Sequence, residues 1–272
     1  MARLKQSLQK RNYITAVQLT DSHLFAELDG ELSGIKTHDS LQHVIELVSA
    51  EQEQLDLLLC TGDISQDGSI ESYQRFAEMA GTLEVPMRWL AGNHDERVAL
   101  HKVCVQTDWL VPVSDVGQWR IVMLDSSVAD QVYGQLAADQ LEILEQALRT
   151  AGERHVLLAV HHHSLPINSQ WMDQIGLHNA DQLLSIISRY NNVRAVICGH
   201  VHQAFDQQQQ GVHWLATPST CIQFTPHSVD FTVDDSAPGY RWLRLYDDGQ
   251  LETGVSRVEH IEFVIDRGAS GY

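Results

Sequence analysis

The sequence has few basic residues. Only 18 Lys and Arg stand against 36 Asp and Glu, so the 272-residue chain carries a formal net charge of -18. A nucleic-acid-binding protein neutralises phosphates with Lys and Arg, and a protein that docks on an anionic membrane needs the same side chains. The composition therefore argues against both kinds of partner.

Cysteine and proline are also scarce, with 4 and 6 copies. The cysteines show no CxxC or zinc-type spacing, and a chain of this length does not need disulfides. No linker or internal repeat divides the sequence, so we expect one domain over residues 1–272. No apolar run approaches the roughly 18 residues of a membrane span, and none follows the basic first residues, so we expect a cytoplasmic protein without a signal peptide.

What the chain does have is alternation of secondary structure. Up to residue 200, short apolar runs typical of strands buried on both faces alternate with segments of helical periodicity. Strands are expected at 13–19, 55–60, 86–90, 119–124, 155–160 and 193–198, and helices at 38–53, 137–150 and 179–190. Asp39 or Ser40 is placed to cap the first helix. This pattern predicts a layered α/β sandwich.

The pattern changes after residue 200. Short strands are expected at 213–216, 231–233, 240–246 and 251–258, and Asp248-Gly249 is a hairpin signal before the last of them. The four glutamines at 207–210, which precede Gly211, are expected at another hairpin turn. We therefore expect antiparallel strands over residues 203–272, after a core at 13–202.

The 15 histidines are the unusual feature of the composition. Five loops that follow predicted strands carry His, Asp or Asn: Asp21-Ser22-His23, Gly62-Asp63, Gly92-Asn93-His94-Asp95, His161-His162-His163 and Gly199-His200-Val201-His202. Ligands of open α/β sheets bind beyond the carboxyl ends of the strands. These loops are therefore expected to converge on one site.

The residue types and spacings indicate metal binding. In D-x-H and H-x-H, an extended backbone would place the first and third side chains on the same side, within reach of one metal or two adjacent ones. Carboxylate and imidazole suit Mn, Fe and Zn, whereas an all-oxygen shell would indicate Mg or Ca. The glycines would let the backbone turn tightly and approach a ligand closely.

The motifs DxH, GD, GNHD, a strand-end His and GHxH, in this order, resemble those of the calcineurin-like metallophosphoesterases. That resemblance implies an α/β/β/α sandwich with a two-metal site at the C-terminal ends of the strands. HHHSLP, ATPSTCIQF at 216–224 and APGYRWLRL at 237–245 are similar to bacterial class III 3′,5′-cyclic-AMP phosphodiesterases, and this similarity extends to Gly271-Tyr272. It implies hydrolysis of cyclic AMP to 5′-AMP, with Fe²⁺ and/or Mn²⁺. The sequence shows no heptads or apolar edge, so either a monomer or a homodimer is expected.

The resemblance also implies roles for single residues. Asp21, His23 and His202 correspond to ligands of the first metal, Asn93, His161 and His200 to ligands of the second, and Asp63 to the bridging carboxylate. His94 falls where the family has a catalytic or substrate-contacting histidine, and Asp95 would orient its imidazole. The expected substrate contacts are His23, Asp63, Asn93, His94 and His202.

A charge count supports an anionic substrate. Two divalent metals bring +4, two carboxylates remove 2 and a bridging hydroxide removes 1, so the site is near +1 and would attract a phosphodiester monoanion. The hydroxide is the expected nucleophile, held between metals about 3.5–4 Å apart. His94, as imidazolium, is expected to protonate the departing 3′ oxygen.

Several alternatives remain at this point. The same metals would serve other cyclic nucleotides or glycerophosphodiesters; a non-catalytic scaffold is disfavoured by the filled ligand positions, and a DNA nuclease by the net charge. His162 and His163 either line the pocket or pack beneath the metals. Side chains of the 216–224 stretch either contact the nucleotide or serve the structure, which concerns Ser219, Thr220, Gln223 and Phe224. Asp125 ends a strand but belongs to no motif.

Overall fold

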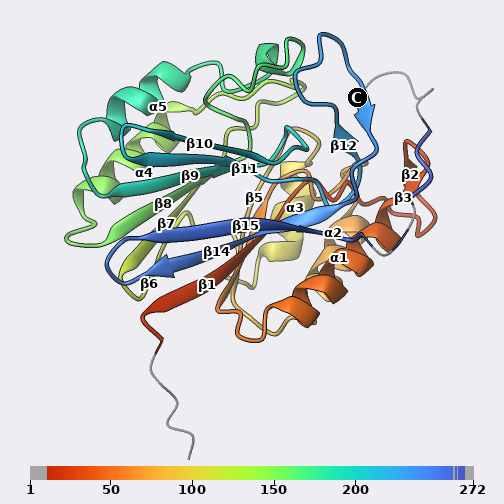
Figure 1. The fold of residues 1–272 in the computed structure, drawn as a ribbon, viewed down its shortest axis with the longest axis horizontal. Helices are drawn as coiled ribbons and strands as arrows, with labels where there is room; N and C mark the ends of the chain where they lie inside the picture. The colour runs from red at the N-terminus through yellow and green to blue at the C-terminus, as the bar shows by residue number, and fades with distance from the viewer. Residues whose placement is uncertain (1–10, 260, 262, 267–272) are drawn as a thin grey trace, which may run out of the picture.

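Two β-sheets pack face to face in the computed structural model, which describes residues 11–259, 261 and 263–266 (Figure 1). The five-stranded sheet contains β1 (Tyr13–Leu19), β4 (Leu57–Thr61), β5 (Met87–Leu90), β14 (Gly239–Tyr246) and β15 (Leu251–Arg257), in the order β15-β14-β1-β4-β5. The six-stranded sheet contains β6 (Val113–Val116), β7 (Trp119–Leu124), β8 (His155–Val160), β9 (Val193–Cys198), β10 (Phe205–Gln209) and β11 (Val212–Ala216), in the order β10-β11-β9-β8-β7-β6.

Helices cover the outer face of each sheet. They are α1 (Thr37–Glu51), α2 (Ile70–Gly81) and α3 (Arg97–Cys104) on the first sheet, and α4 (Ala138–Arg149) and α5 (Ala180–Ile187) on the second. Short elements complete the fold: β2 (Glu31–Leu32) with β3 (Ile35–Lys36), β12 (Gln223–Phe224) with β13 (Val233–Asp234), and the 3₁₀ turn η1 (Met172–Gln174). The four-layer α/β/β/α arrangement that the motifs implied is confirmed.

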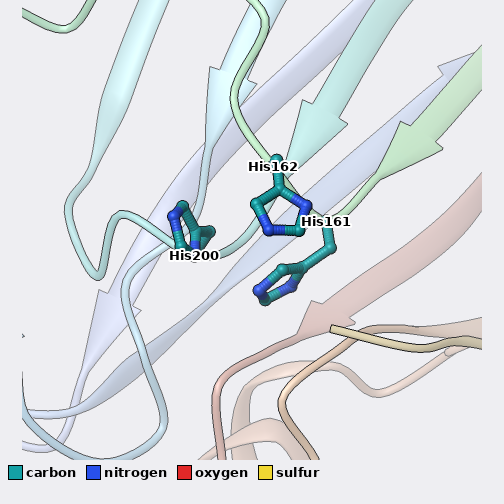
Figure 2. A group of neighbouring side chains, drawn as sticks. All are labelled: His161, His162 and His200. Carbon is teal, nitrogen blue, oxygen red and sulfur yellow. The ribbon is translucent and has the colours of Figure 1, made fainter. Parts of the chain in front are cut away.

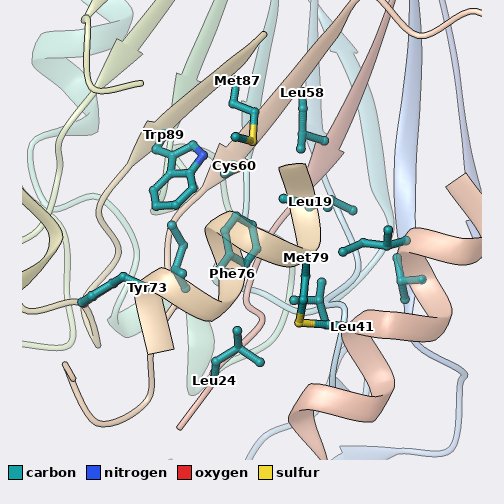
Figure 3. Close-up of a cluster of buried hydrophobic side chains, with 14 of the residues drawn as sticks. Leu19, Leu24, Leu41, Leu58, Cys60, Tyr73, Phe76, Met79, Met87 and Trp89 are labelled. Atoms are coloured by element: carbon teal, nitrogen blue, oxygen red, sulfur yellow. The ribbon is translucent and has the colours of Figure 1, made fainter. Parts of the chain in front are cut away.

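Strand β4 shows how the sequence produces these layers. Leu57 and Leu59 point between the sheets, while Leu58 and Cys60 point to the helices, as the two-residue period of a strand requires. Figure 3 shows Phe76 of α2 against this helix-facing side. Each fully buried leucine contributes about 1.5–3 kcal/mol through the apolar surface that it removes from water. A strand buried on both faces must therefore be apolar along its whole length.

The strands and helices expected before residue 200 are present, with ends displaced by no more than three residues. Helices α2 and α3 and strand β6 were not predicted. The predicted cap of the first helix is wrong, because α1 already begins at Thr37 and its N-cap Lys36 makes no side-chain hydrogen bond. Lys36 ends β3, so the chain passes from strand to helix without a capping turn.

The C-terminal part differs from expectation in several places, and the strand expected at 231–233 shares only Val233 with β13. Gln207, Gln208 and Gln209 lie within β10, and only Gln210 and Gly211 form the turn, both with positive φ. Strand β11 pairs with β9 in parallel, not antiparallel. The predicted hairpin at Asp248-Gly249 is confirmed and joins β14 to β15. Strand β14 also pairs antiparallel with β1.

All four cysteines are free and buried, as their spacing predicts. In the described part of the chain, no helix has the length and hydropathy needed to cross a bilayer. Gly271 and Tyr272 lie outside the described residues, and the outer bounds of the domain, 1 and 272, stay a prediction.

Candidate metal centre

The five motif loops meet at one edge of the fold, where the carboxyl ends of strands from both sheets lie together (Figure 1). Asp21 and His23 follow β1, Asp63 follows β4, Asn93 and His94 follow β5, His161 follows β8, and His200 and His202 follow β9. Because β1, β4 and β5 belong to one sheet and β8 and β9 to the other, the site requires that the two sheets be packed together.

Asp21, His23 and His202 form one group, which we call the first cluster. All three side chains are fully buried, and their ligand atoms lie within 4.8 Å of one another. The Nε2 atoms of His23 and His202 are 3.2 Å apart, and Asp21 Oδ1 lies 3.4 Å from His202 Nε2. One carboxylate and two imidazoles therefore face a common point.

Asn93, His161 and His200 form the second cluster. The Oδ1 atom of Asn93 lies 3.2 Å from His161 Nε2, and the rings of His161 and His200 have centroids 5.2 Å apart. Figure 2 shows these two rings converging from the ends of β8 and β9, with His162 beside them. Asp63 lies between the clusters, because its Oδ2 is 3.2 Å from His161 Nε2 and 3.9 Å from His23 Nε2.

The backbone at these positions is left-handed rather than extended. The φ angles are 54° at Asp21, 46° at His23, 49° at Asp63, 66° at His200 and 49° at His202. The expectation that an extended D-x-H or H-x-H segment aligns the side chains is therefore wrong. Non-glycine residues in this region cost of order 1–3 kcal/mol each where the conformation is sparsely populated, and such strain concentrates at functional sites.

Hydrogen bonds between the loops hold this backbone in place. The amide of Asp21 donates to Gly62 O at 3.0 Å, and the amide of His23 donates to Asp63 O at 2.9 Å. The amide of His200 donates to both carboxylate oxygens of Asp21, at 3.0 and 3.1 Å. These bonds fix loops from both sheets to one another.

Each imidazole of the clusters is tied through one ring nitrogen. His23 Nδ1 lies 2.6 Å from Gln66 Oε1, His161 Nδ1 lies 2.7 Å from Thr61 O, and His202 Nδ1 lies 2.8 Å from Ile222 O. His200 is reversed, with Nε2 3.1 Å from Ile175 O and a buried Nδ1 that has no hydrogen-bond partner among the described residues. Metal-binding histidines are held in this manner, with the second nitrogen bonded to a carbonyl or carboxylate.

The pKa shifts of Asp63 and His23 favour the protonation states of metal ligands, whereas that of His161 favours the imidazolium. Burial alone would raise the pKa of the Asp63 carboxyl, but His161, His94 and His23 outweigh burial and hold that pKa well below its usual range. Burial lowers the pKa of His23 to about 3. Burial acts in the same direction on His161, but the Asp63 and Asp21 carboxylates raise its pKa to about 9. Ionised carboxylates and a neutral His23 are the forms that bind cations.

Comparison with known proteins gives the family. The model of the calcineurin-like phosphoesterases matches residues 14–204. The chain belongs to the calcineurin-like phosphoesterase family.

Two relatives of this phosphoesterase cover nearly its whole length. The 3′,5′-cyclic adenosine monophosphate phosphodiesterase CpdA of Pseudomonas aeruginosa is 51% identical over 95% of both chains. The protein of the same name from Escherichia coli K12 is 42% identical over 95% of both chains. A solved dimetal phosphatase from Danio rerio, 17% identical, covers 90% of this chain and 99% of its own with a TM-score of 0.63, which supports the fold alone.

His94 and Asp95 lie on the loop after β5 in the phosphoesterase. The His94 ring lies edge-on to the His23 ring with centroids 5.0 Å apart, and His94 lines a cavity of about 410 Å³. The Asp95 carboxylate accepts backbone N–H bonds from Gly92 at 2.8 Å and Ser65 at 3.0 Å. Asp95 therefore fixes the loops after β4 and β5 to each other; its predicted role in orienting His94 stays a prediction.

The histidines that follow His161 lie behind the second cluster. His162 is fully buried, its Nδ1 lies 2.7 Å from Ser126 Oγ, and its ring centroid is 4.6 Å from that of His200. His163 Nε2 lies 3.5 Å from Asp173 Oδ1. These positions favour packing beneath the cluster over lining the pocket. Ligand atoms of His161, His162 and His200 also lie within 4.8 Å of one another.

Segment 216–224 wraps the loop that carries Asp21 and does not face the cavity. Ser219 Oγ donates to Asp21 O at 2.6 Å, and Gln223 Nε2 donates to Ser219 O at 2.8 Å. Phe224 is 1% exposed and stacks on the His202 ring, with centroids 4.2 Å apart and planes 10° apart. Thr220 is fully buried as well. Of the two uses left open for these residues, the structural one is supported.

Two glycines of the motifs make room for site residues rather than for a ligand. A Cβ on Gly92 would collide with the Asp63 carboxylate, and a Cβ on Gly199 would collide with Thr20 and Asp21. Sequence reasoning also missed Gln66 and Ile175, which anchor ligand-type imidazoles. A carbonyl anchor such as Ile175 O leaves no mark in the sequence, because every residue carries one.

Proposed function

We propose that this phosphoesterase hydrolyses 3′,5′-cyclic AMP to 5′-AMP at a site for two divalent ions, Fe²⁺ and/or Mn²⁺, and thereby lowers cellular cyclic AMP. The observation that carries the proposal is the position of Asp63, whose carboxylate lies between two clusters of anchored imidazoles. The names of the relatives from Pseudomonas aeruginosa and Escherichia coli, which align over nearly the full chain, support the choice of substrate.

The donor set fits two ions. His23 and His202 turn their Nε2 atoms toward each other at 3.2 Å while both Nδ1 atoms are tied elsewhere. Two imidazole lone pairs at that separation repel each other unless a proton or a metal cation is shared between them. We assign Asp21, His23 and His202 to one ion, and Asn93, His161 and His200 to the other, with Asp63 shared. Mixed nitrogen and oxygen ligands suit Fe, Mn and Zn.

When bound, such ions lower the pKa of water so that hydroxide exists at neutral pH, and they polarise the phosphoryl oxygens. In the proposed reaction, this hydroxide oxygen forms a bond to phosphorus while the bond to the 3′ oxygen breaks. His94 lines the cavity beside His23, where the substrate would enter. As imidazolium, it would give its proton to the departing 3′ oxygen, a contribution of about 10²–10⁴-fold.

The cavity supports a small substrate. Its volume of about 410 Å³ lies within the usual range for small-molecule sites, and Asn93 and His94 both line it. His23, Asp63 and His202 would contact the phosphate through the ions rather than through the cavity wall. A duplex DNA substrate is disfavoured by the net charge of -18.

The experiment that tests the function is metal analysis of the purified protein followed by product identification with cyclic AMP. We expect two ions per chain and 5′-AMP as the only nucleotide product. His94→Ala should keep both ions and lose about 10²–10⁴-fold in kcat. The matched control is His101→Ala, which replaces an exposed histidine of α3 and should change neither the number of bound ions nor kcat. Near wild-type turnover by His94→Ala would remove the residue from the mechanism.

The choice of substrate has its own test. Steady-state comparison of cyclic AMP, cyclic GMP and bis(p-nitrophenyl) phosphate should give the highest kcat/KM with cyclic AMP. A higher value with the aryl diester would favour a broader phosphodiesterase. A protein that binds no ion and hydrolyses none of the three would favour a scaffold. A cytoplasmic location and a monomeric or dimeric state stay predictions of the sequence.

A further inference from the structure

The wall of the cavity beside His94 has an unusual charge pattern. Four carboxylates line it: Asp67, Asp95, Glu96 and Asp130. Within the described residues, Arg97 is the one Lys or Arg side chain on this wall. A phosphodiester is an anion, so an acidic entrance in a protein of net charge -18 would oppose its approach.

Three of these carboxylates are engaged by the backbone. Asp67 accepts from the amides of Ala26 and Ser69, and Glu96 caps α3 by accepting from the amides of Val98 and Ala99. Asp95 accepts from two loop amides in the same way. These carboxylates thus lie on the wall because they hold loops and the N-terminal end of α3 in place. The structure then needs a separate group to favour an anion.

Arg97 is held in a defined orientation on this wall. Its Nη2 lies 3.0 Å from Asp125 Oδ2, and its Nε donates to Ser127 Oγ at 3.0 Å. Asp125 Oδ1 in turn accepts from the amide and the hydroxyl of Ser127, at 2.8 and 2.7 Å. The Arg97 side chain is still 52% exposed. In the described part of the chain, no hydrogen bond uses its Nη1, so one edge is fixed and the other is available.

We propose that Arg97 is a substrate-binding residue that attracts the phosphodiester anion and contacts it in the cavity, and that Asp125 and Ser127 are positioning residues for its guanidinium. The proposal rests on the function proposed above. It also gives a role to Asp125, a strand-end carboxylate that belongs to none of the motifs. An exposed ion pair contributes little to stability, so the arrangement is better explained by orientation of the cation.

The test compares Arg97→Gln with Arg189→Gln. Arg189 pairs with Glu145 at 3.0 Å and is 53% exposed. Arg189→Gln therefore removes one positive charge and one surface ion pair, as Arg97→Gln does, but away from the cavity. We expect Arg97→Gln to lower kcat/KM for cyclic AMP about tenfold, mostly through KM, and Arg189→Gln to leave it unchanged. Raising salt to about 0.5 M should lower kcat/KM of wild type more than that of Arg97→Gln.

Two further variants test orientation. Arg97→Lys keeps the charge but not the planar fork and should lose about two- to threefold. Asp125→Asn should raise KM by a similar factor in the wild-type background and have no further effect in Arg97→Gln, because it acts through Arg97. Equal losses in both backgrounds would show a structural effect instead.

The outcomes separate this inference from the proposed function. Bis(p-nitrophenyl) phosphate is also a phosphodiester monoanion, so all variants are measured with it in parallel. Turnover of the aryl diester without turnover of cyclic AMP would overturn the proposed substrate, and Arg97 would still be tested. Unchanged KM and unchanged salt dependence of Arg97→Gln with both substrates would overturn the role of Arg97 and leave the proposed function standing.

Discussion

The two clusters have similar ligand chemistry but are supported in different ways. In the first cluster, the His202 ring is stacked on Phe224 and its Nδ1 is bonded to Ile222 O. Behind the second cluster lies another imidazole, His162, which Ser126 holds through Nδ1. One cluster therefore has an apolar support and the other a polar one.

The difference has energetic consequences. An aromatic side chain buried against a ligand contributes through dispersion and the apolar surface that it removes from water, and it leaves no polar atom to satisfy. A buried imidazole instead carries polar nitrogens that cost free energy unless they are hydrogen-bonded. We infer that the first cluster depends on apolar packing against one of its imidazoles, while the second depends on a hydrogen bond to the imidazole next to it.

Replacing the residue that the clusters share gives the largest expected effect. Asp63→Asn removes the carboxylate next to both His23 and His161, and with it the charge that raises the pKa of His161. We expect loss of both ions and a fall in kcat of at least about 10³-fold, because the ions supply the hydroxide. Metal analysis and steady-state kinetics measure this. Two ions bound with wild-type affinity would show that Asp63 is not shared.

Phe224→Ala should weaken ion binding at the first cluster and leave ion binding at the second unchanged. The substitution removes the ring beneath His202 and leaves a cavity in a fully packed region, so we expect a loss of about 3–5 kcal/mol in the free energy of unfolding. Affinity for the ion of the first cluster should fall about 10–100-fold, as it does when the groups that orient a ligand are removed. The second cluster should be unaffected.

Urea unfolding and titration of the metal-free protein with Mn²⁺ check both parts. Phe224→Leu, which keeps an apolar side chain below His202, is the matched variant and should show smaller changes in both measurements. If Phe224→Ala weakened the two ions equally, the stacking contact would not be specific to one cluster.

The sequence predicted which loops come together better than it predicted the backbone conformation of those loops. Asp21, His23 and Asp63 were found from residue type and from their place after apolar strands. Their left-handed backbone was not, since extended geometry was assumed for D-x-H. Non-glycine residues in this region depend on hydrogen bonds from other loops, and such long-range support has no local signature.

The elements of the fold also differ in whether the sequence predicted them. Strand β4 was predicted because a fully buried strand is continuously apolar, while α2 and α3 were not found. Helix α3 (Arg97–Cys104) has only 8 residues, which is too few for a helical period to stand out. The four-layer arrangement was implied by the resemblance to the calcineurin-like metallophosphoesterases, whereas the local patterns alone predicted only a layered α/β sandwich.

Ser126→Ala gives the smallest expected effect and tests the polar support of the second cluster. The change removes the partner of His162 Nδ1, so we expect a loss of about 1–3 kcal/mol in the free energy of unfolding. His162 would then be free to tilt against His200, whose ring centroid is 4.6 Å away. Affinity for the ion of the second cluster should fall by about tenfold, and the first should be unchanged.

A matched variant tests whether the loss of ion affinity is specific to the Ser126–His162 contact. Ser72→Ala removes another buried hydroxyl, one on α2 that donates to Ser69 O at 2.7 Å, and should lower stability without changing Mn²⁺ affinity. If Ser126→Ala behaved like Ser72→Ala, the Ser126–His162 contact would stabilise the fold alone. If it instead weakened only the second ion, the polar support would differ from the aromatic support of the first cluster in function as well as in chemistry.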